Sequence, residues 1–347
     1  MIHSEETSIK ALALHKVGNK STGEGLHLSK EVLQTDEAIR QLLLYYFITP
    51  FKDQEYFRFF HDSGLHMNEV YSFVSSIFED TDSFFDQSVD LAKYLYEQST
   101  HPKIKAGEFY VVLFRKLVLD GEEVDALGLF KSESKETYLK VYASGGGYEI
   151  QSDDGININK LDKGCLIFNS SADDGYVVAA VDNLNRNSDA RYWFDDFLQI
   201  RQREDDYYQT ENAISMCKSF VTTKLPQEFD LDRADQAEML NDSAAYFKGN
   251  ENFDLDDYAQ QVIRQPEVIE SFKQYKTDYE GNNDLSLADT FDISSPAVKK
   301  KSRFFKSVIK LDKNFHIYIH GKREFVKKGV DSETGMNYYQ LMFQKEE

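Results

Sequence analysis

The sequence predicts an α+β fold, in which helices and antiparallel strands occupy separate stretches of the chain. Residues 108–183 hold a succession of short β-prone runs separated by Gly, Asp and Ser turns, which is typical of an antiparallel meander. Helix-type spacing of apolar residues precedes this stretch and returns after Asp189. Four further strand-like runs end the chain, so we expect a small C-terminal antiparallel sheet.

The stretch before the meander begins with one strand and continues with helices. Ser8–Gly18 predicts a strand buried on both sides, because apolar residues occupy both sets of alternating positions. Asp36 is in position to N-cap a helix that runs through EAIRQLLLYYF. Residues 68–79 and 82–98 predict two further helices, and the second has a broad apolar face.

The meander itself comprises roughly six or seven predicted strands. Glu108–Leu119 is the first, Asp120-Gly121 is a hairpin-type turn, and the chain returns through VDALGLFKS. The later strands are TYLKVYA, YEIQ, ININ, GCLIFN and GYVVAAVDN. The glycine-rich stretch SGGGYE at 144–149 joins two of them and lacks the spacing of a phosphate-binding loop, so we interpret it as a hairpin turn.

We expect two domains, an α+β N-terminal domain at 1–203 and a second region at 204–347. The second region opens with an acidic helical segment, since residues 225–296 hold seventeen Asp or Glu and only five Lys or Arg. A basic β region follows it, with four strands predicted at SVIKL, FHIYIH, REFVK and MNYYQLMF.

The composition limits the classes of function. Asp and Glu outnumber Lys and Arg by 60 to 40, so the formal net charge is −20, which repels polyanions. No apolar run is long enough for a membrane span, and the N-terminus MIHSEETSIK is acidic where a signal peptide is basic. We therefore expect a cytoplasmic protein with no membrane partner. Cys165 and Cys217 lie in apolar patterns and are expected to be reduced core residues.

No set of residues fits catalysis better than an ordinary structural role. Asp125 followed by Glu133-Ser134-Lys135 loosely resembles the carboxylate and lysine arrangement of metal-dependent nucleases, which keeps nuclease activity open as an alternative. His316 and His320 would lie on one face of a strand but about 13 Å apart, too far to hold one metal ion. We therefore expect no catalytic residue, no bound metal and no cofactor.

The stretch from Lys299 to Lys328 is strongly basic within this acidic chain. It holds eleven Lys or Arg and two acids, which gives a local charge of +9. Strand alternation should place Phe315, Ile317 and Ile319 on one side and His316, Tyr318 and His320 on the other. Interleaved basic and aromatic groups suit contact with nucleic-acid phosphates. The predicted DNA-binding residues are Lys299, Lys300, Lys301, Arg303, Lys306, Lys310, Lys313, Lys322, Arg323, Lys327 and Lys328.

Six of these side chains are expected to be exposed, namely Lys299, Lys300, Lys301, Arg303, Lys306 and Lys310. Lysine, which dominates the set, acts as a point charge on phosphates, so we expect binding without strong sequence preference. Two other interpretations stay open. The lysines could keep an edge strand from aggregating, or they could pair with the acidic 225–296 region of the same chain or of a partner.

The chain also resembles a known family, the bacterial nucleoid-associated proteins of the NdpA/YejK type. The segments that carry the resemblance are ALHKV, GEFYVVLFRKLVLDGEEVDALGLF, GININKLDKGCLIFN, ARYWFDDFLQI, REDDYYQTENAISMCKSFV and NFHIYIHGKREFVKKGVDSETGMNYYQLMF. The resemblance implies a bacterial protein located with the nucleoid that binds DNA, and it offers no catalytic residues to carry over. The net charge of −20 favours a localised DNA contact, or a role through other nucleoid proteins.

The sequence therefore predicts a non-enzymatic, nucleoid-associated protein that binds double-stranded DNA by its phosphate backbone. The alternative is a protein-interaction or DNA-mimic module that uses the acidic helices, and the third hypothesis is the metal-dependent nuclease. Because the acidic and basic blocks can pair across a symmetric dimer, we also expect a homodimer.

Overall fold

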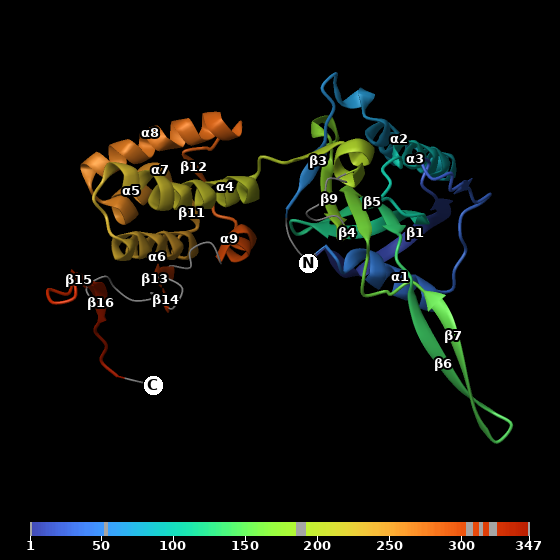
Figure 1. Cartoon of the computed structure of the whole chain (residues 1–347). Helices are drawn as coiled ribbons and strands as arrows, with labels where there is room; N and C mark the ends of the chain where they lie inside the picture. Colours follow the sequence, from blue (N-terminus) through green and yellow to red (C-terminus); the bar gives the residue numbers. More distant parts are fainter. Residues whose placement is uncertain are drawn as a thin grey trace. The chain divides into compact units, whose positions relative to one another are not determined.

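The chain folds into two units, an N-terminal unit at Met1–Arg203 and a C-terminal unit at Glu204–Glu347 (Figure 1). The computed structural model describes residues 2–51, 55–184, 192–302, 308–311, 315–318 and 325–345. Helices and antiparallel strands occur in both units, so the predicted α+β class is confirmed.

The N-terminal unit is built on an eight-stranded sheet in which every pairing is antiparallel. Its strand order is β10-β3-β9-β8-β5-β4-β1-β2. The strands are β1 (His3–Val17), β2 (Leu26–His27), β3 (Phe57–Phe59), β4 (Gly107–Leu119), β5 (Glu122–Ser132), β8 (Lys163–Phe168), β9 (Val177–Asp182) and β10 (Ile200–Gln202). The predicted turn between β4 and β5 is confirmed, with positive φ values at Asp120 and Gly121.

Helices cover both faces of this sheet, as the doubly apolar pattern of its strands predicts. On β4, Tyr110, Val112 and Phe114 belong to the core beneath α1 (Glu37–Ile48), where Phe47 stacks on Phe130 with ring centroids 4.2 Å apart. The alternate residues of β4 face a second core. That core packs against α2 (Glu69–Glu79), α3 (Phe84–Gln98) and the π-helical η4 (Trp193–Leu198).

The helix starts follow the capping residues in the sequence. The Asp36 side chain accepts a hydrogen bond from the Ile39 amide and begins α1, as predicted. Asn68 caps α2 in the same way through the Tyr71 amide. Short helical turns connect the larger elements at η1 (Leu65–Met67), η2 (Thr81–Ser83) and η3 (Ala172–Asp174).

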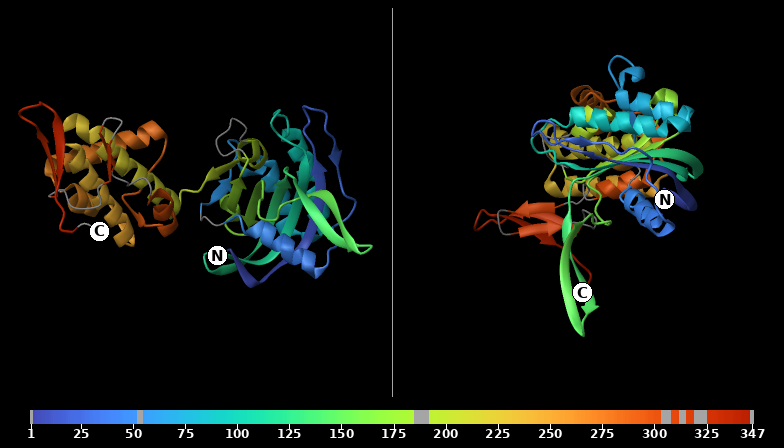
Figure 2. Two further views of the ribbon diagram at one scale, coloured as in Figure 1. Left: turned by 60° about the horizontal axis from the view of Figure 1, so that its bottom comes forward. Right: turned by 90° about the vertical axis from the view of Figure 1, so that its right-hand side faces the viewer.

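Two of the predicted meander strands leave the main sheet. β6 (Glu136–Ser144) and β7 (Gly147–Gly155) pair only with each other among the described residues and project from the unit as a long hairpin, which we call the arm (Figures 1 and 2). Its tip is the predicted glycine turn, where Gly145 and Gly146 have φ values of 53° and 87°. The predicted strand ININ is wrong, because residues 156–159 form a loop and turn that leads back to β8.

The C-terminal unit is a helical bundle with a separate aromatic core. Phe220, Phe247, Phe253, Tyr258 and Phe272 are buried there. The helical elements are α4 (Asp206–Ser219), η5 (Phe220–Lys224), α5 (Leu225–Glu228), α6 (Arg233–Gly249), α7 (Leu255–Tyr258), η6 (Ala259–Ile263), α8 (Pro266–Asn283) and α9 (Ser295–Lys301). The short strands β11 (Asn252–Asp254) and β12 (Thr290–Asp292) pair beside them.

Among its described residues, the C-terminal β region forms two antiparallel hairpins, which are two small sheets where one was expected. β13 (Val308–Leu311) pairs with β14 (Phe315–Tyr318), and β15 (Val326–Val330) pairs with β16 (Asn337–Leu341). Both hairpins pack on α6, whose buried Ala234 and Ala237 contact a small apolar cluster. The hairpin members of that cluster are Leu311, Ile317, Val326 and Tyr339.

Both cysteines are buried, as predicted. Burial raises the pKa of the Cys165 thiol and raises that of Cys217 to about 12, so both stay protonated at neutral pH. In the described part of the chain, no helix combines the length and the apolar character that crossing a membrane requires.

Candidate nucleic-acid interface

The predicted basic segment begins in the last turn of α9, where Lys299, Lys300 and Lys301 follow one another. Cations are favourable at this end of a helix because the unpaired carbonyl groups carry partial negative charge. Five predicted DNA-binding residues lie outside the described residues, namely Arg303, Lys306, Lys313, Lys322 and Arg323. For Lys310 only the backbone is described, in β13, where the register pairs it with His316.

Two of the three α9 lysines interact with α4, and the expected exposure is wrong for Lys301, whereas Lys299 and Lys300 are exposed. The Lys301 ammonium lies 3.1 Å from a Glu211 carboxylate oxygen and donates to Ser215 Oγ at 3.2 Å, and its side chain is only 15% exposed. Lys300 lies 3.7 Å from the same carboxylate and 5.3 Å from the centre of the Tyr207 ring. The basic segment therefore pairs in part with its own unit, although the acid belongs to α4 and not to residues 225–296.

The other described lysines of the segment stay in solvent. Lys299, Lys327 and Lys328 are exposed. The strand β15 is fixed against α6 by its buried residue Val326, so the following residues extend the hairpin away from this anchor. Lys327 is thereby held on a defined strand next to the packed core, which reduces the entropy that a phosphate contact would cost.

The C-terminal hairpins also carry aromatic side chains. Tyr338 lies over Gly329 of the paired strand, since a Cβ at that glycine would be 2.4 Å from the tyrosine ring. On β14 the predicted alternation holds for Ile317, which packs toward α6, and for His316 and Tyr318, which are exposed, but Phe315 is 65% exposed and does not share the packing of Ile317. The predicted positions of Ile319 and His320 lie outside the described residues.

The rest of the C-terminal unit is acidic, and its few basic residues are largely paired. Lys276 lies 3.0 Å from Glu280 and 3.1 Å from Asp289, and Arg264 lies 2.8 Å from Asp242. Because residues 225–296 contain many more acids than bases, most of their carboxylates have no basic partner within the same segment. Along the sequence, negative charge is therefore concentrated in residues 225–296 and positive charge in residues 299–328.

The residues of the nuclease hypothesis are far apart. Asp125 lies near the start of β5 and pairs with Arg115, whereas Glu133 follows the other end of the strand. Eight residues of extended chain separate them by about 26 Å, so one metal ion cannot bind both. Lys135 pairs with Glu108 at 2.8 Å. Among the residues that the structure describes, no group of three or more His, Cys, Asp or Glu is arranged to hold a metal ion.

Glu133 instead belongs to a buried charge cluster that the sequence did not reveal. Its carboxylate lies 3.1 Å from the Lys131 ammonium and 3.8 Å from that of Lys163, and it accepts a hydrogen bond from the Tyr192 hydroxyl at 2.9 Å. Asp182 lies 3.1 Å from Lys163 and completes a cluster of two cations and two anions. Burial lowers the pKa of Lys131 and raises that of Tyr192. The four charged side chains are at most 6% exposed, so the cluster is enclosed in the N-terminal unit.

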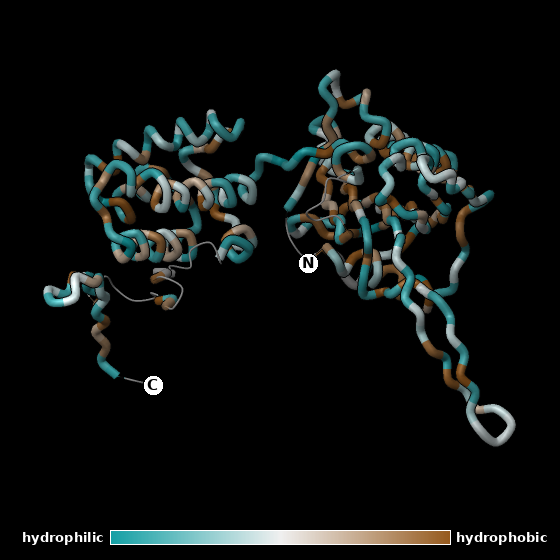
Figure 3. Tube along the Cα trace, in the orientation of Figure 1, coloured by the Kyte–Doolittle hydropathy of each residue, from teal (hydrophilic) through white to brown (hydrophobic). Residues whose placement is uncertain are grey.

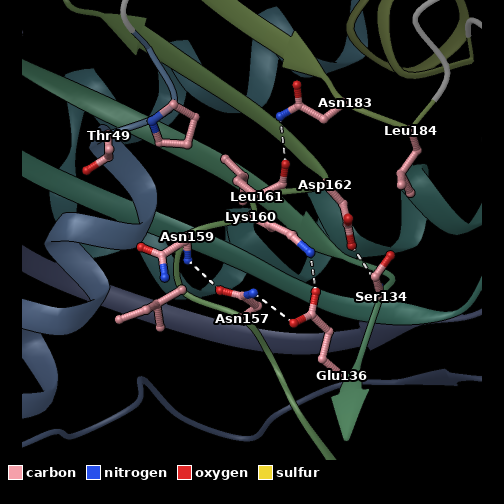
Figure 4. A pocket seen from close by; sticks show the side chains of 12 residues that line it. Thr49, Ser134, Glu136, Asn157, Asn159, Lys160, Leu161, Asp162, Asn183 and Leu184 are labelled. Atoms are coloured by element: carbon pink, nitrogen blue, oxygen red, sulfur yellow. Dashed lines mark hydrogen bonds and ion pairs between the residues drawn. The ribbon is translucent and has the colours of Figure 1, made fainter.

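A cavity of about 530 Å³ lies between the end of α1, the base of the arm and the loop before β8 (Figure 4). Its polar side chains bond to one another, since the Glu136 carboxylate accepts from Asn157 at 2.8 Å and from Lys160 at 2.5 Å. Asp162 accepts the backbone amide of Ser134 at 2.7 Å. These polar groups of the rim therefore bond to other groups of the rim, and nothing in the rim resembles a reaction centre.

The comparisons with known proteins give one family match, which covers most of the chain. The family model described as nucleoid-associated protein YejK matches residues 13–335 of the 347-residue chain. A search of the curated proteins gives no significant match.

Proposed function

The chain belongs to the family of nucleoid-associated protein YejK, and from this premise we propose that it binds double-stranded DNA through the phosphate backbone without catalysing a reaction. The contact residues are the exposed basic side chains of the C-terminal unit. The observation that carries the proposal is the placement of Lys299, Lys327 and Lys328, which are exposed at one end of α9 and on a hairpin anchored to α6.

The residue types indicate how DNA is held. Nine of the eleven basic residues between positions 299 and 328 are lysines. A lysine ammonium neutralises a phosphate as a point charge, whereas the planar arginine side chain is the group that reads guanine edges. The protein therefore tolerates many DNA sequences, and the acidic helices keep the footprint short by repelling DNA from the rest of the unit. Its location is the nucleoid of a bacterial cell, where other nucleoid proteins are further partners.

A titration of full-length protein with fluorescent duplex DNA tests the proposal. Replacing Lys299, Lys327 and Lys328 with Gln should weaken binding by at least about tenfold at moderate salt, because three phosphate contacts are lost. A matched control replaces Lys16, Lys30 and Lys103 with Gln, since these exposed lysines lie in the N-terminal unit and their loss changes the net charge equally. Equal affinity of both triple variants would contradict the proposed contact surface.

The acidic helices support a second candidate function, an interaction with a basic protein partner. Residues 225–296 carry seventeen acids and five bases, and part of those bases already pair within the segment. If wild-type protein binds no DNA but binds a lysine-rich polypeptide in a salt-dependent way, this function replaces DNA binding. The two outcomes are separate, because the first needs the exposed lysines and the second needs the exposed acids.

A further inference from the structure

The arm of the N-terminal unit is an amphipathic hairpin with one uncovered apolar face. The register places Val141 opposite Ile150, and Leu139 and Tyr148 lie on the same side of the hairpin. These four side chains are 61%, 66%, 68% and 80% exposed, respectively. Figure 3 shows hydrophobic residues along both strands of the arm. An isolated two-stranded hairpin is at best marginally stable in water, so an apolar face of this kind needs a cover.

The opposite face of the arm is suited to water. Lys140 forms an ion pair with Asp153 at 3.0 Å, and its ammonium lies 5.5 Å from the centre of the Tyr138 ring. Lys140 also faces Gln151 directly across the two strands. Tyr138 and Tyr142 also lie on this face and are 44% and 39% exposed, so it mixes charged and aromatic groups, whereas the more exposed apolar side chains lie on the other face.

Helix α1 has a second uncovered apolar surface. Nine of its twelve residues are apolar or aromatic, a composition typical of a helix covered on all sides. Tyr46, Phe47 and Ile48 are buried against the sheet. Ile39, Leu42 and Tyr45 recur at every third residue and are exposed, so they form a stripe that the unit leaves in solvent.

The stripe and the arm are neighbours on one side of the unit. The Tyr45 hydroxyl donates to Asn159 at 3.1 Å, in the loop that follows the arm. The cavity of Figure 4 lies between the two surfaces, and the exposed residues Ile158 and Leu184 belong to its lining. In the described part of the N-terminal unit, every exposed large apolar residue except Met67 lies on the arm, on α1, just before α1 or in this cavity lining.

We propose that this side of the N-terminal unit binds a second copy of the chain by reciprocal exchange of arms. The apolar face of each arm lies across the Ile39–Leu42–Tyr45 stripe of the partner and continues over its cavity rim. A two-fold axis makes the two contacts identical, so the same symmetric dimer covers both arms and both α1 stripes. The proposal concerns the N-terminal unit alone and does not depend on DNA binding.

The available area favours exchange over simple stacking of two arms. Strands of nine residues make the arm about 30 Å long and, with two strands, about 10 Å wide, so that one face offers about 300 Å². Two arms stacked on each other would bury about 600 Å², which is the size of a crystal contact. Reciprocal contacts of two arms with two acceptor surfaces bury about 1,200 Å², the lower end of specific interfaces.

Sedimentation velocity of the full-length chain tests the assembly. We expect twice the chain mass of 40.2 kDa at micromolar concentration. Replacing both Val141 and Ile150 with Glu should raise the dissociation constant at least about a hundredfold, because charge is placed in the centre of the contact. The matched control, Lys140→Gln with Gln151→Glu, changes the net charge equally on the opposite face of the arm and should leave the dimer intact.

The acceptor surface has its own test. Leu42→Glu should also produce monomers under exchange, whereas arms that stack only on each other would be unaffected by it. An Ile150→Cys chain mixed with a Leu42→Cys chain should form a disulfide-linked heterodimer on oxidation, since the natural cysteines are buried. Unchanged far-UV circular dichroism shows that the variants are folded. A monomeric wild type, or a dimer that survives both Glu substitutions on the arm, would overturn the proposal and leave the arm to a different protein.

Discussion

Replacing Glu133 with Gln should destabilise the N-terminal unit by about 3 kcal/mol or more. The Glu133 side chain is 2% exposed, and both lysines beside it, Lys131 and Lys163, are fully buried. The substitution keeps the shape and a hydrogen-bond acceptor for Tyr192 but removes one of the two anions in the cluster. A buried charge left without its partner typically costs about 3–5 kcal/mol.

The loss of stability caused by Glu133→Gln should become smaller as the pH rises. Burial already lowers the pKa of Lys131, and loss of the neighbouring carboxylate lowers it further. A lysine with a depressed folded-state pKa binds fewer protons in the folded state than in the unfolded state, so stability increases with pH in the alkaline range. The difference in stability between Glu133→Gln and wild type should therefore be larger at neutral pH than near the ordinary lysine pKa.

Equilibrium unfolding in denaturant, followed by tryptophan fluorescence, measures this effect. Trp193 is the single tryptophan, is buried, and donates to the Gly164 carbonyl at 3.3 Å, so it reports on the N-terminal unit. Glu122→Gln, an exposed change at the other end of β5, should stay within about 0.5 kcal/mol. Adding Lys131→Met to Glu133→Gln should recover part of the loss, because the unpaired cation is removed. A loss below about 1 kcal/mol in Glu133→Gln would refute the assignment of a buried charge cluster.

Three further predictions follow from buried groups and separated carboxylates. Burial lowers the pKa of His15 to about 4, below its unfolded-state value of about 6.5. The free energy of unfolding should therefore fall as the pH drops from about 6.5 toward 4, and a His15→Gln variant should lose less stability in that pH range. Cys165 and Cys217 should resist a thiol reagent under native conditions and react after unfolding, as a colorimetric thiol assay can measure. Incubation of DNA with Mg²⁺ or Mn²⁺ and the protein should give no cleavage on a gel, and cleavage that Glu133→Gln abolishes would contradict this.

Local signals in the sequence predicted much of the fold. The capping side chain of Asp36, the Asp120-Gly121 turn and the glycine tip of the arm each use chemistry that acts within a few residues. Three of the four C-terminal strands were also located, whereas the predicted strand REFVK overlaps β15 only at Val326 and Lys327. These features depend on neighbours in the chain, so one sequence is sufficient to find them.

Features that depend on distant contacts were missed. The alternation of the arm is the same whether its strands join a sheet or project from it, so the sequence could not separate β6 and β7 from the main sheet. Lys131 and Lys163 are buried because the β5–β8 register places them side by side, next to Glu133 and Asp182. The only local sign of this cluster was a lysine next to an apolar run in each of two strands.

In the candidate DNA interface, too, the sequence predicted the local feature and not the distant contacts. Composition located the basic segment, but only tertiary packing shows that Lys301 faces Glu211 while Lys327 stays exposed. The net charge of the segment gives the same weight to each of its eleven basic residues. The packing separates lysines that stabilise the C-terminal unit from lysines that are available to phosphates.

The salt dependence of DNA affinity tests the central claim most directly. If about four to six basic side chains engage phosphates, the logarithm of the association constant should fall against the logarithm of the salt concentration with a slope of about −4 to −5. Replacing Lys299, Lys327 and Lys328 with Gln should make that slope shallower by about 2.7, since each lost contact contributes about 0.9. The control at Lys16, Lys30 and Lys103 should keep the wild-type slope. An identical slope in wild type and both triple variants would contradict DNA binding through the C-terminal lysines.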